Sequence, residues 1–265
     1  RVTEFQSSKY GVEVLVYDSW KIANDILQTS SSTELTFPLS IAIVPSETPN
    51  AAVNDLGINE LLSAGRSNFS GSPANRRHNI AIGSASLNGL LIAPGEEFSL
   101  VAALGDIDGT TGYKEELVIK GNETILEFGG GLCQVGTTIF RTTLNSGLPI
   151  TERRNHSYRV SYYEPAGTDA TIYGPHPDYR FINDTGNHIL IQTHIEGDEL
   201  VYEFWGTKDG RVATQTTPVV YNITSPPPTK YIETLDLPVG KVKCTERAHK
   251  GADTSFDYSV AYPDG

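Results

Sequence analysis

Hydrophobic and polar positions follow regular spacings along most of the chain. In the first part, residues 11–16 alternate as in a strand, and residues 20–27 have helical spacing after Asp18, a residue type that caps helices. Residues 34–44 indicate a second strand, interrupted by Pro38. This order predicts a partial α/β element over residues 1–54, followed by a linker at 45–50.

The middle of the chain begins with helical spacing. Residues 53–63 and 79–91 each place apolar side chains on one helical face, and a polar stretch at 65–72 predicts a loop between them. Short strands are predicted at residues 98–100 and 116–120. A further helix is predicted from residue 134 to about 145, because Gly147 and Pro149 follow as stop signals.

Strand-like patterns dominate after this helix. They occur at residues 158–163, 169–173, 179–183, 188–195 and 200–205, the last two as a hairpin. We therefore predict an α+β fold in which an antiparallel sheet packs on a few helices, with a main domain at 55–210. Residues 211–265 are predicted to form a linker and a small β-rich C-terminal module.

Three glycines, Gly129 to Gly131, precede Leu132 and Cys133. A helix that starts here puts Cys133 at or just before its first turn, where N–H groups and the helix dipole stabilise a thiolate. His156 lies downstream and could act as a base, which gives the hypothesis of a cysteine nucleophile with a histidine partner. A buried structural cysteine beside a glycine turn is the alternative.

Composition restricts the remaining possibilities. The net charge of −12 argues against nucleic acid as a partner. The chain has no methionine and starts at Arg1, so we expect a segment of a longer protein whose signal or anchor lies elsewhere. Neither a disulfide between Cys133 and Cys244 nor a metal site is expected from their contexts.

Several motifs, in order, resemble the VanW domain family. Residues 128–140 read FGGGLCQVGTTIF, and RxHNI at 76–80 with PGEEFS at 94–99 precede them. ERxxHS at 152–157 and GTDAT at 167–171 follow. The resemblance covers about residues 65–207, and Gly136 departs from it, since the family more often has serine there. Residues upstream are similar to a peptidoglycan-binding element that often precedes VanW domains.

The resemblance implies a bacterial cell-surface protein that acts on the cell wall from outside the cell. For some members it implies L,D-transpeptidase activity, which cross-links peptidoglycan stem peptides through a cysteine acyl-enzyme. Stem peptides would then be the partner, no cofactor or metal would be needed, and any membrane attachment would come from an anchor outside this segment.

Within this hypothesis the residues take definite roles. Cys133 is the nucleophile and His156 the base and then the acid. Asp169 is the candidate that orients His156, if its strand pairs beside the one that starts at Ser157; the alternative is an aspartate that caps the turn after Gly167. The predicted helix carries the chain away from Cys133 by about 1.5 Å per residue. An extended return over residues 150–155 then brings His156 back to the same level.

The remaining candidates concern the substrate. Arg76 or Arg153 could bind its carboxylates. Backbone N–H groups of residues 132–134 could stabilise an oxyanion. Further candidate contacts are Gly130, Gly131, Gln134 and Tyr162. His78 is a second candidate base.

Two other functional classes stay open at this point. In a wall-binding module without catalysis, Cys133 would be a packing residue and the tyrosines near residues 158–173 a binding surface. In a cysteine peptidase or amidase, the same dyad would act with water as the acceptor.

Overall fold

The computed structural model describes residues 11–30, 35–44, 56–120, 123–244 and 248–263. The predicted linker at 45–50 lies outside them. The chain divides into two compact units, Ser7–Leu56 and one that includes Gly57–Gly265.

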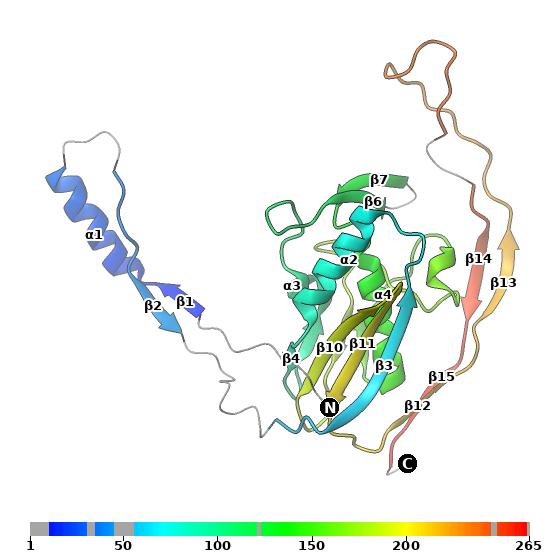
Figure 1. Cartoon of the computed structure of the whole chain (residues 1–265), viewed down its shortest axis with the longest axis horizontal. Helices are drawn as coiled ribbons and strands as arrows, with labels where there is room; N and C mark the ends of the chain where they lie inside the picture. Colours follow the sequence, from blue (N-terminus) through cyan, green and yellow to red (C-terminus); the bar gives the residue numbers. More distant parts are fainter. Residues whose placement is uncertain (1–10, 31–34, 45–55, 121–122, 245–247, 264–265) are drawn as a thin grey trace. The chain divides into compact units, whose positions relative to one another are not determined.

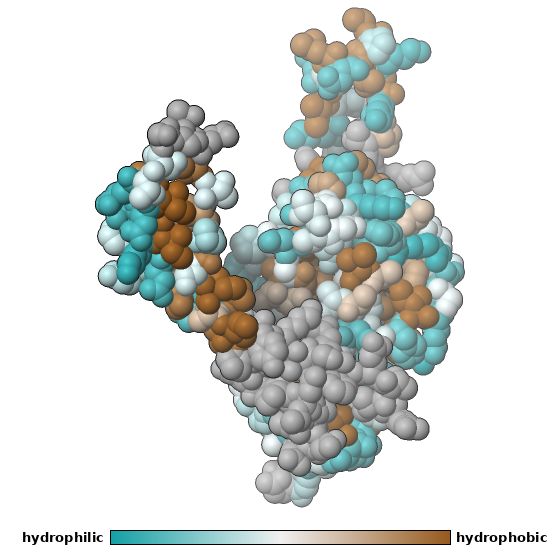
Figure 2. Space-filling model, turned by 60° about the vertical axis from the view of Figure 1, so that its left-hand side comes forward, coloured by the Kyte–Doolittle hydropathy of each residue, from teal (hydrophilic) through white to brown (hydrophobic). Residues whose placement is uncertain are grey.

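The N-terminal unit contains one helix and two short strands (Figure 1). Strands β1 (Gly11–Val14) and β2 (Ile41–Val44) pair antiparallel, and α1 (Val16–Thr29) connects them. The helix starts four residues before predicted, and Asp18 lies in its first turn rather than at its N-cap. Figure 2 shows hydrophobic side chains gathered along this unit. Its exposed hydrophobic residues include Trp20 and Ile43.

The larger unit holds the remaining elements. Its helices are α2 (Ala74–Leu87), α3 (Leu100–Leu104), α4 (Leu132–Ser146) and a 3-10 turn at Ser161–Tyr163. Its first strands are β3 (Glu60–Asn68), β4 (Leu91–Ile92), β5 (Glu97–Ser99), β6 (Glu115–Lys120), β7 (Glu123–Phe128) and β8 (Ile150–Glu152). The later strands are β9 (Arg180–Ile182), β10 (Ile189–Glu196), β11 (Glu199–Gly206), β12 (Val212–Gln215), β13 (Val219–Thr224), β14 (Gly251–Ser255) and β15 (Tyr258–Ala261). Among the described helices, none has the length and apolar character that crossing a bilayer requires.

A four-stranded antiparallel sheet in the order β3-β11-β10-β4 supports the larger unit (Figure 1). Helices α2 and α4 pack against this sheet and against each other. The core between them includes fully buried Ile80, Ile139 and Phe204. The predicted α+β class, the β10–β11 hairpin and the helix after the glycine turn are therefore confirmed.

Strand β3 replaces a predicted helix and loop. Its residues that face α4 are small or hydroxylated: Ser63 Oγ donates to the Thr142 carbonyl at 2.9 Å, and Ser67 Oγ lies 2.5 Å from Thr138 Oγ1. A Cβ on Gly65 would come within 2.5 Å of the Thr142 backbone nitrogen. The apolar positions that suggested helix 53–63 end at Leu62, and the buried face of the strand carries no apolar pattern.

Helix α4 is buried despite its threonines. The hydroxyls of Thr138, Thr142 and Thr143 donate to carbonyls four residues earlier, at 2.6, 2.9 and 2.9 Å. These bonds satisfy polar groups that burial would otherwise leave without partners. The helix can therefore lie close to β3 across an interface of hydroxyls.

The strands predicted at 158–163 and 169–173 are wrong. This segment forms no ladder; apart from the 3-10 turn it is irregular. Arg141, from α4, donates to the carbonyls of Tyr163, Glu164 and Thr168 at 2.7, 3.0 and 3.0 Å. These side-chain bonds replace the strand pairing that the alternation suggested. Helix α3 and strand β7 were not predicted.

The C-terminal strands pair within residues 212–261, and this ribbon contacts the end of α4. β12 pairs with β15, and β13 pairs with β14. Arg211 Nη1 donates to the Gly147 carbonyl at 3.1 Å, and the Tyr258 hydroxyl donates to the Leu144 carbonyl at 2.9 Å. Both acceptors lie at the C-terminal end of α4, where carbonyls lack full intrahelical pairing; the Leu144 carbonyl also accepts the Gly147 N–H at 3.3 Å.

The close approach of β3 to α4 gives a stability prediction. Gly65→Ala should destabilise the larger unit by about 1–3 kcal/mol, because the added methyl group overlaps Thr142 and Thr138. Thermal unfolding measures this as a lower Tm. Gly186→Ala is the matched control, since nothing lies within 4 Å of its Cβ position. Equal Tm values for the two variants would contradict the close packing.

Candidate active site

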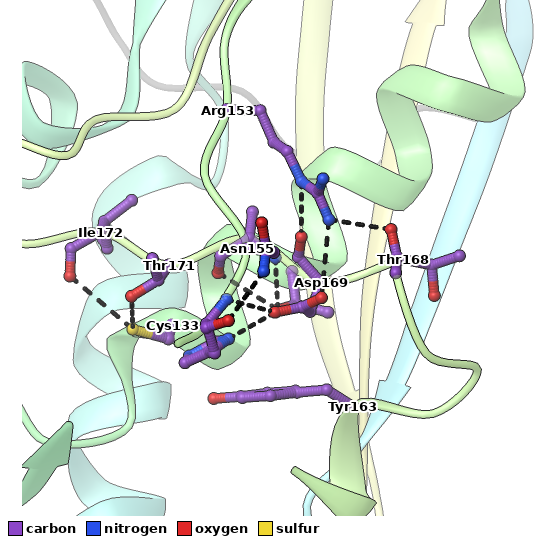
Figure 3. A network of polar contacts seen from close by, with 12 residues as sticks. Cys133, Arg153, Asn155, Tyr163, Thr168, Asp169, Thr171 and Ile172 are labelled. Atoms are coloured by element: carbon purple, nitrogen blue, oxygen red, sulfur yellow. Dashed lines mark hydrogen bonds and ion pairs between the residues drawn. The ribbon is translucent and has the colours of Figure 1, made fainter. Parts of the chain in front are cut away.

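Cys133 lies in the first turn of α4, directly after the glycine turn, as predicted. The N-cap, Gly131, has a left-handed conformation with φ of 115°. Cys133 as a residue is half-buried. Its Sγ lies 3.4 Å from Thr171 Oγ1 and 3.7 Å from the Ile172 carbonyl oxygen (Figure 3).

Close packing explains the glycines of this turn. A Cβ on Gly130 would come within 2.7 Å of the Glu116 backbone, and one on Gly131 within 2.9 Å of the Arg76 side chain. Gly131 also needs its positive φ, which residues with a Cβ rarely adopt. The two glycines predicted as substrate contacts thus hold Cys133 close to β6 and α2.

His156 and Asp169 form a buried pair beside Cys133. The His156 Nδ1 lies 2.6 Å from Asp169 Oδ2, and the same oxygen accepts the His156 backbone N–H at 2.8 Å. The Tyr163 ring stacks on the imidazole with a centroid distance of 4.6 Å. Because Nδ1 is bound to Asp169, Nε2 is the ring nitrogen that is left to interact with the Cys133 thiol.

These contacts shift the pKa values of the three groups. Burial raises the pKa of the Cys133 thiol, but the hydrogen bond and the charge of His156 outweigh it and bring the pKa to about 7. Burial lowers the pKa of His156, whereas hydrogen bonds with Asp169 and Cys133 raise it to about 9. Burial also opposes ionisation of Asp169, but the bonds from His156 keep its pKa below the ordinary value. From about pH 7 to 9, the pair is therefore a thiolate and an imidazolium.

The start of α4 offers fewer free backbone donors than predicted. The N–H of Leu132 donates to the Gly129 carbonyl at 3.0 Å, and that of Gln134 donates to the Gly131 carbonyl at 2.9 Å. Among the described residues, no backbone bond engages the Cys133 N–H. Of the three N–H groups predicted to stabilise an oxyanion, that of Cys133 is therefore the remaining candidate.

Arg153 supports Asp169 and its loop. Its Nε donates to the Asp169 carbonyl and its Nη2 to the Gly167 carbonyl, both at 2.8 Å. Nη2 also lies 3.5 Å from Asp169 Oδ1. The guanidinium is thus engaged by the protein, and Figure 3 shows it directed at the loop that carries Asp169.

Arg76, Gln134 and Tyr162 form a second group next to Cys133. Arg76 Nη2 donates to Gln134 Oε1 at 2.8 Å and to the Tyr163 hydroxyl at 3.3 Å. The guanidinium lies over the Tyr162 ring, 4.5 Å from its centroid. The structure therefore brings three predicted substrate contacts together.

His78 lies apart from this arrangement. It is on α2, and its Nε2 contacts the Gly112 carbonyl at 2.9 Å. In the part of the chain that the structure describes, no three His, Cys, Asp or Glu side chains are grouped so that they could hold a metal ion.

Sequence reasoning missed three groups of this site. Thr171 and Ile172 contact the thiol, and the Tyr163 ring covers His156. The GTDAT segment was used only for Asp169, although its last threonine reaches Cys133. No local pattern signals the stacking of Tyr163, since it depends on the irregular loop.

Fold and site together define a class: an α+β domain with a cysteine at a helix N-terminus, next to a histidine held by an aspartate. Residues 75–205 match the family described as VanW like protein. This domain of the chain belongs to the VanW-like family, as its motifs predicted.

Two curated relatives match the chain. It is 32% identical to YoaR of Bacillus subtilis (strain 168) over 139 residues, which are 52% of this chain and 46% of that protein. It is 30% identical over 139 residues to the vancomycin B-type resistance protein VanW of Enterococcus faecalis (strain ATCC 700802 / V583), covering 51% of this chain and 50% of that protein. The chain thus spans about half the length of these relatives. No solved structure matches it.

The pKa of Cys133 can be tested by alkylation. The rate of carbamidomethylation of Cys133 should rise with pH around a midpoint near 7, because the thiolate forms there. In His156→Gln the midpoint should move above the ordinary thiol value, since burial remains and the imidazolium is lost. Peptide mapping at each pH separates Cys133 from the exposed Cys244. A Cys133 that does not react in the folded protein would contradict this electrostatic description.

Proposed function

We propose that this chain is an L,D-transpeptidase that cross-links peptidoglycan stem peptides through a Cys133 acyl-enzyme. The observation that carries the proposal is the Cys133 thiol beside a His156 whose Nδ1 is bound to Asp169. This arrangement supports nucleophilic catalysis because the thiolate is present near neutral pH.

In the first half-reaction, the Cys133 thiolate attacks the carbonyl carbon of an L-centred residue in a donor tetrapeptide. The tetrahedral oxyanion forms near the Cys133 N–H, at the positive end of α4. As the C–N bond breaks, the His156 imidazolium gives its proton to the departing amine. A thioester and free D-alanine result, and His156 is neutral.

In the second half-reaction, a side-chain amine of another stem peptide attacks the thioester carbon. Neutral His156 accepts a proton from this amine. The C–S bond then breaks, so that Cys133 leaves as a thiolate and the imidazolium is restored. Asp169 fixes the imidazole orientation in both half-reactions, and its carboxylate stabilises the imidazolium that forms in the second.

The proposed setting is the bacterial cell wall, outside the membrane. The name of one relative connects that protein with vancomycin resistance. Stem peptides of the wall supply both a donor carbonyl and an acceptor amine, which suits the chemistry of the site. A net charge of −12 makes a polyanionic partner unfavourable.

Incubation with disaccharide-tetrapeptides, followed by mass spectrometry, tests the proposal. The unmodified protein should form cross-linked dimers and release D-alanine, and Cys133→Ala should form none. Shortened monomers in place of dimers would mean that water is the acceptor, so the protein would be a hydrolase. Unchanged peptides that nevertheless bind would favour a wall-binding module.

The role of His156 gives a separate prediction. His156→Gln should slow acyl-enzyme formation by about 10²–10⁴-fold, because no group then supplies the proton to the leaving amine. Glutamine is preferred to alanine because the side chain is buried under Tyr163, and truncation would leave a cavity. His78→Gln serves as control and should keep the activity. If His156→Gln kept the activity and His78→Gln lost it, His78 would be the base instead.

A further inference from the structure

Arg76 is a buried cation without an acidic partner. The residue is 7% exposed, yet the groups that its side chain contacts are all neutral: Ser72 Oγ, Gln134 Oε1, the Tyr163 hydroxyl and the Tyr162 ring. No carboxylate of the described residues forms an ion pair with it. Buried charges are normally paired, since leaving water costs several kcal/mol.

Two half-buried arginines of this region differ from it. Arg153 has the carboxylate of Asp169, and Arg141 donates to four backbone carbonyls of residues 66 and 163–168. Each of them holds a loop in place. Within the described part of the chain, the hydrogen bonds of the Arg76 side chain all go to side-chain atoms and hold no backbone segment, so its position is not explained in the same way.

The group lies directly beside the proposed nucleophile. Arg76 contacts Gln134, which follows Cys133 in the first turn of α4, and its side chain packs on Gly131. The Tyr163 hydroxyl accepts its hydrogen bond, while the ring of the same tyrosine stacks on His156. Burial raises the pKa values of Tyr162 and Tyr163; a negative charge at Cys133 raises them further, and the positive charge of Arg76 lowers them. Both charges therefore act on the same two tyrosines.

The guanidinium is also held rigidly. Gln134 is oriented by its own donation to Ser67 Oγ at 2.6 Å and to the Asn68 carbonyl at 3.2 Å, so its Oε1 faces Arg76. Tyr162 covers one face of the guanidinium. A preorganised guanidinium loses little freedom when it binds an anion, and its planar donors match a carboxylate.

We propose that Arg76 binds a free carboxylate of the donor peptide, next to the carbonyl that Cys133 attacks. The identity of the donor rests on the proposed function, whereas anion binding beside Cys133 does not. In a tetrapeptide donor this carboxylate belongs to the leaving residue, one residue of about 3.3–3.6 Å beyond the broken bond. Donors with an amidated or extended C-terminus should therefore react poorly.

Anion binding is tested first with iodoacetate and iodoacetamide, which have similar size and differ in charge. The ratio of their rates, iodoacetate over iodoacetamide, should be about tenfold higher at Cys133 than at Cys244, as expected for a charge-assisted contact. Arg76→Gln should abolish this difference. Arg66→Gln, which removes an exposed cation paired with Glu196, should leave it unchanged. An equal ratio at Cys133 in the unmodified protein and in Arg76→Gln would overturn the proposal.

The unmodified protein provides a second test that needs no folded variant. D-Alanine should protect Cys133 from iodoacetamide, and D-alaninamide, which lacks the carboxylate, should protect it less. Equal protection by both, or none by either, would overturn the proposal even where Arg76→Gln fails to fold.

Donor peptides then separate this inference from the proposed function. The free-acid tetrapeptide should react at least tenfold faster than its C-terminal amide, and Arg76→Gln should slow only the free acid. If neither donor reacts while the iodoacetate preference is present, the transpeptidase assignment fails and the anion site stands. If both donors react equally well in both proteins, the anion site fails and the transpeptidase assignment stands.

Discussion

The site depends on the hydrogen bonds between the Asp169 carboxylate and His156. One of its oxygens accepts both the backbone N–H and the Nδ1 of His156, and the other lies near Arg153. A single acceptor thus fixes the main chain and the side chain of His156 together. This matters because residues 153–172 have little regular structure that could hold an imidazole in place. The cost of burying the three charged groups is offset by their mutual pairing, and this pairing also sets the pKa values of Cys133 and His156.

Two arginines hold the backbone of the loop that carries His156 and Asp169. Arg141 reaches it from α4, and Arg153 lies within it, and both donate to backbone carbonyls. They replace the hydrogen bonds that a sheet would supply. In this way a rigid helix that carries the cysteine and an irregular loop that carries the histidine are joined by side chains. The loop is then free to present Tyr162 and Tyr163 beside the thiol, a placement that a flat strand would not allow.

The sequence predicted the parts of the structure whose signals are local. Helix α4 follows from its apolar spacing between a glycine run and Gly147, and the β10–β11 hairpin from its alternation around a turn. Strand β3 was missed because its buried positions are Ser63, Gly65 and Ser67, which read as a polar loop. Cys133 and His156 were proposed from their types and order, and Asp169 from a strand pairing that does not form. The three side chains nevertheless lie together. The contacts of Thr171, Ile172 and Tyr163 depend on tertiary folding, so no spacing along the chain could have indicated them.

The hydrogen bonds from Arg211 and Tyr258 to the end of α4 affect the choice of boundaries for a shorter fragment of this protein. Both residues lie beyond residue 205, where the match to the VanW-like family ends. Val260 also packs against the Gly147 position. A fragment that stops at the family boundary would leave the last carbonyls of the cysteine-bearing helix without these partners. A fragment that keeps these contacts has to extend beyond the family match, through β15.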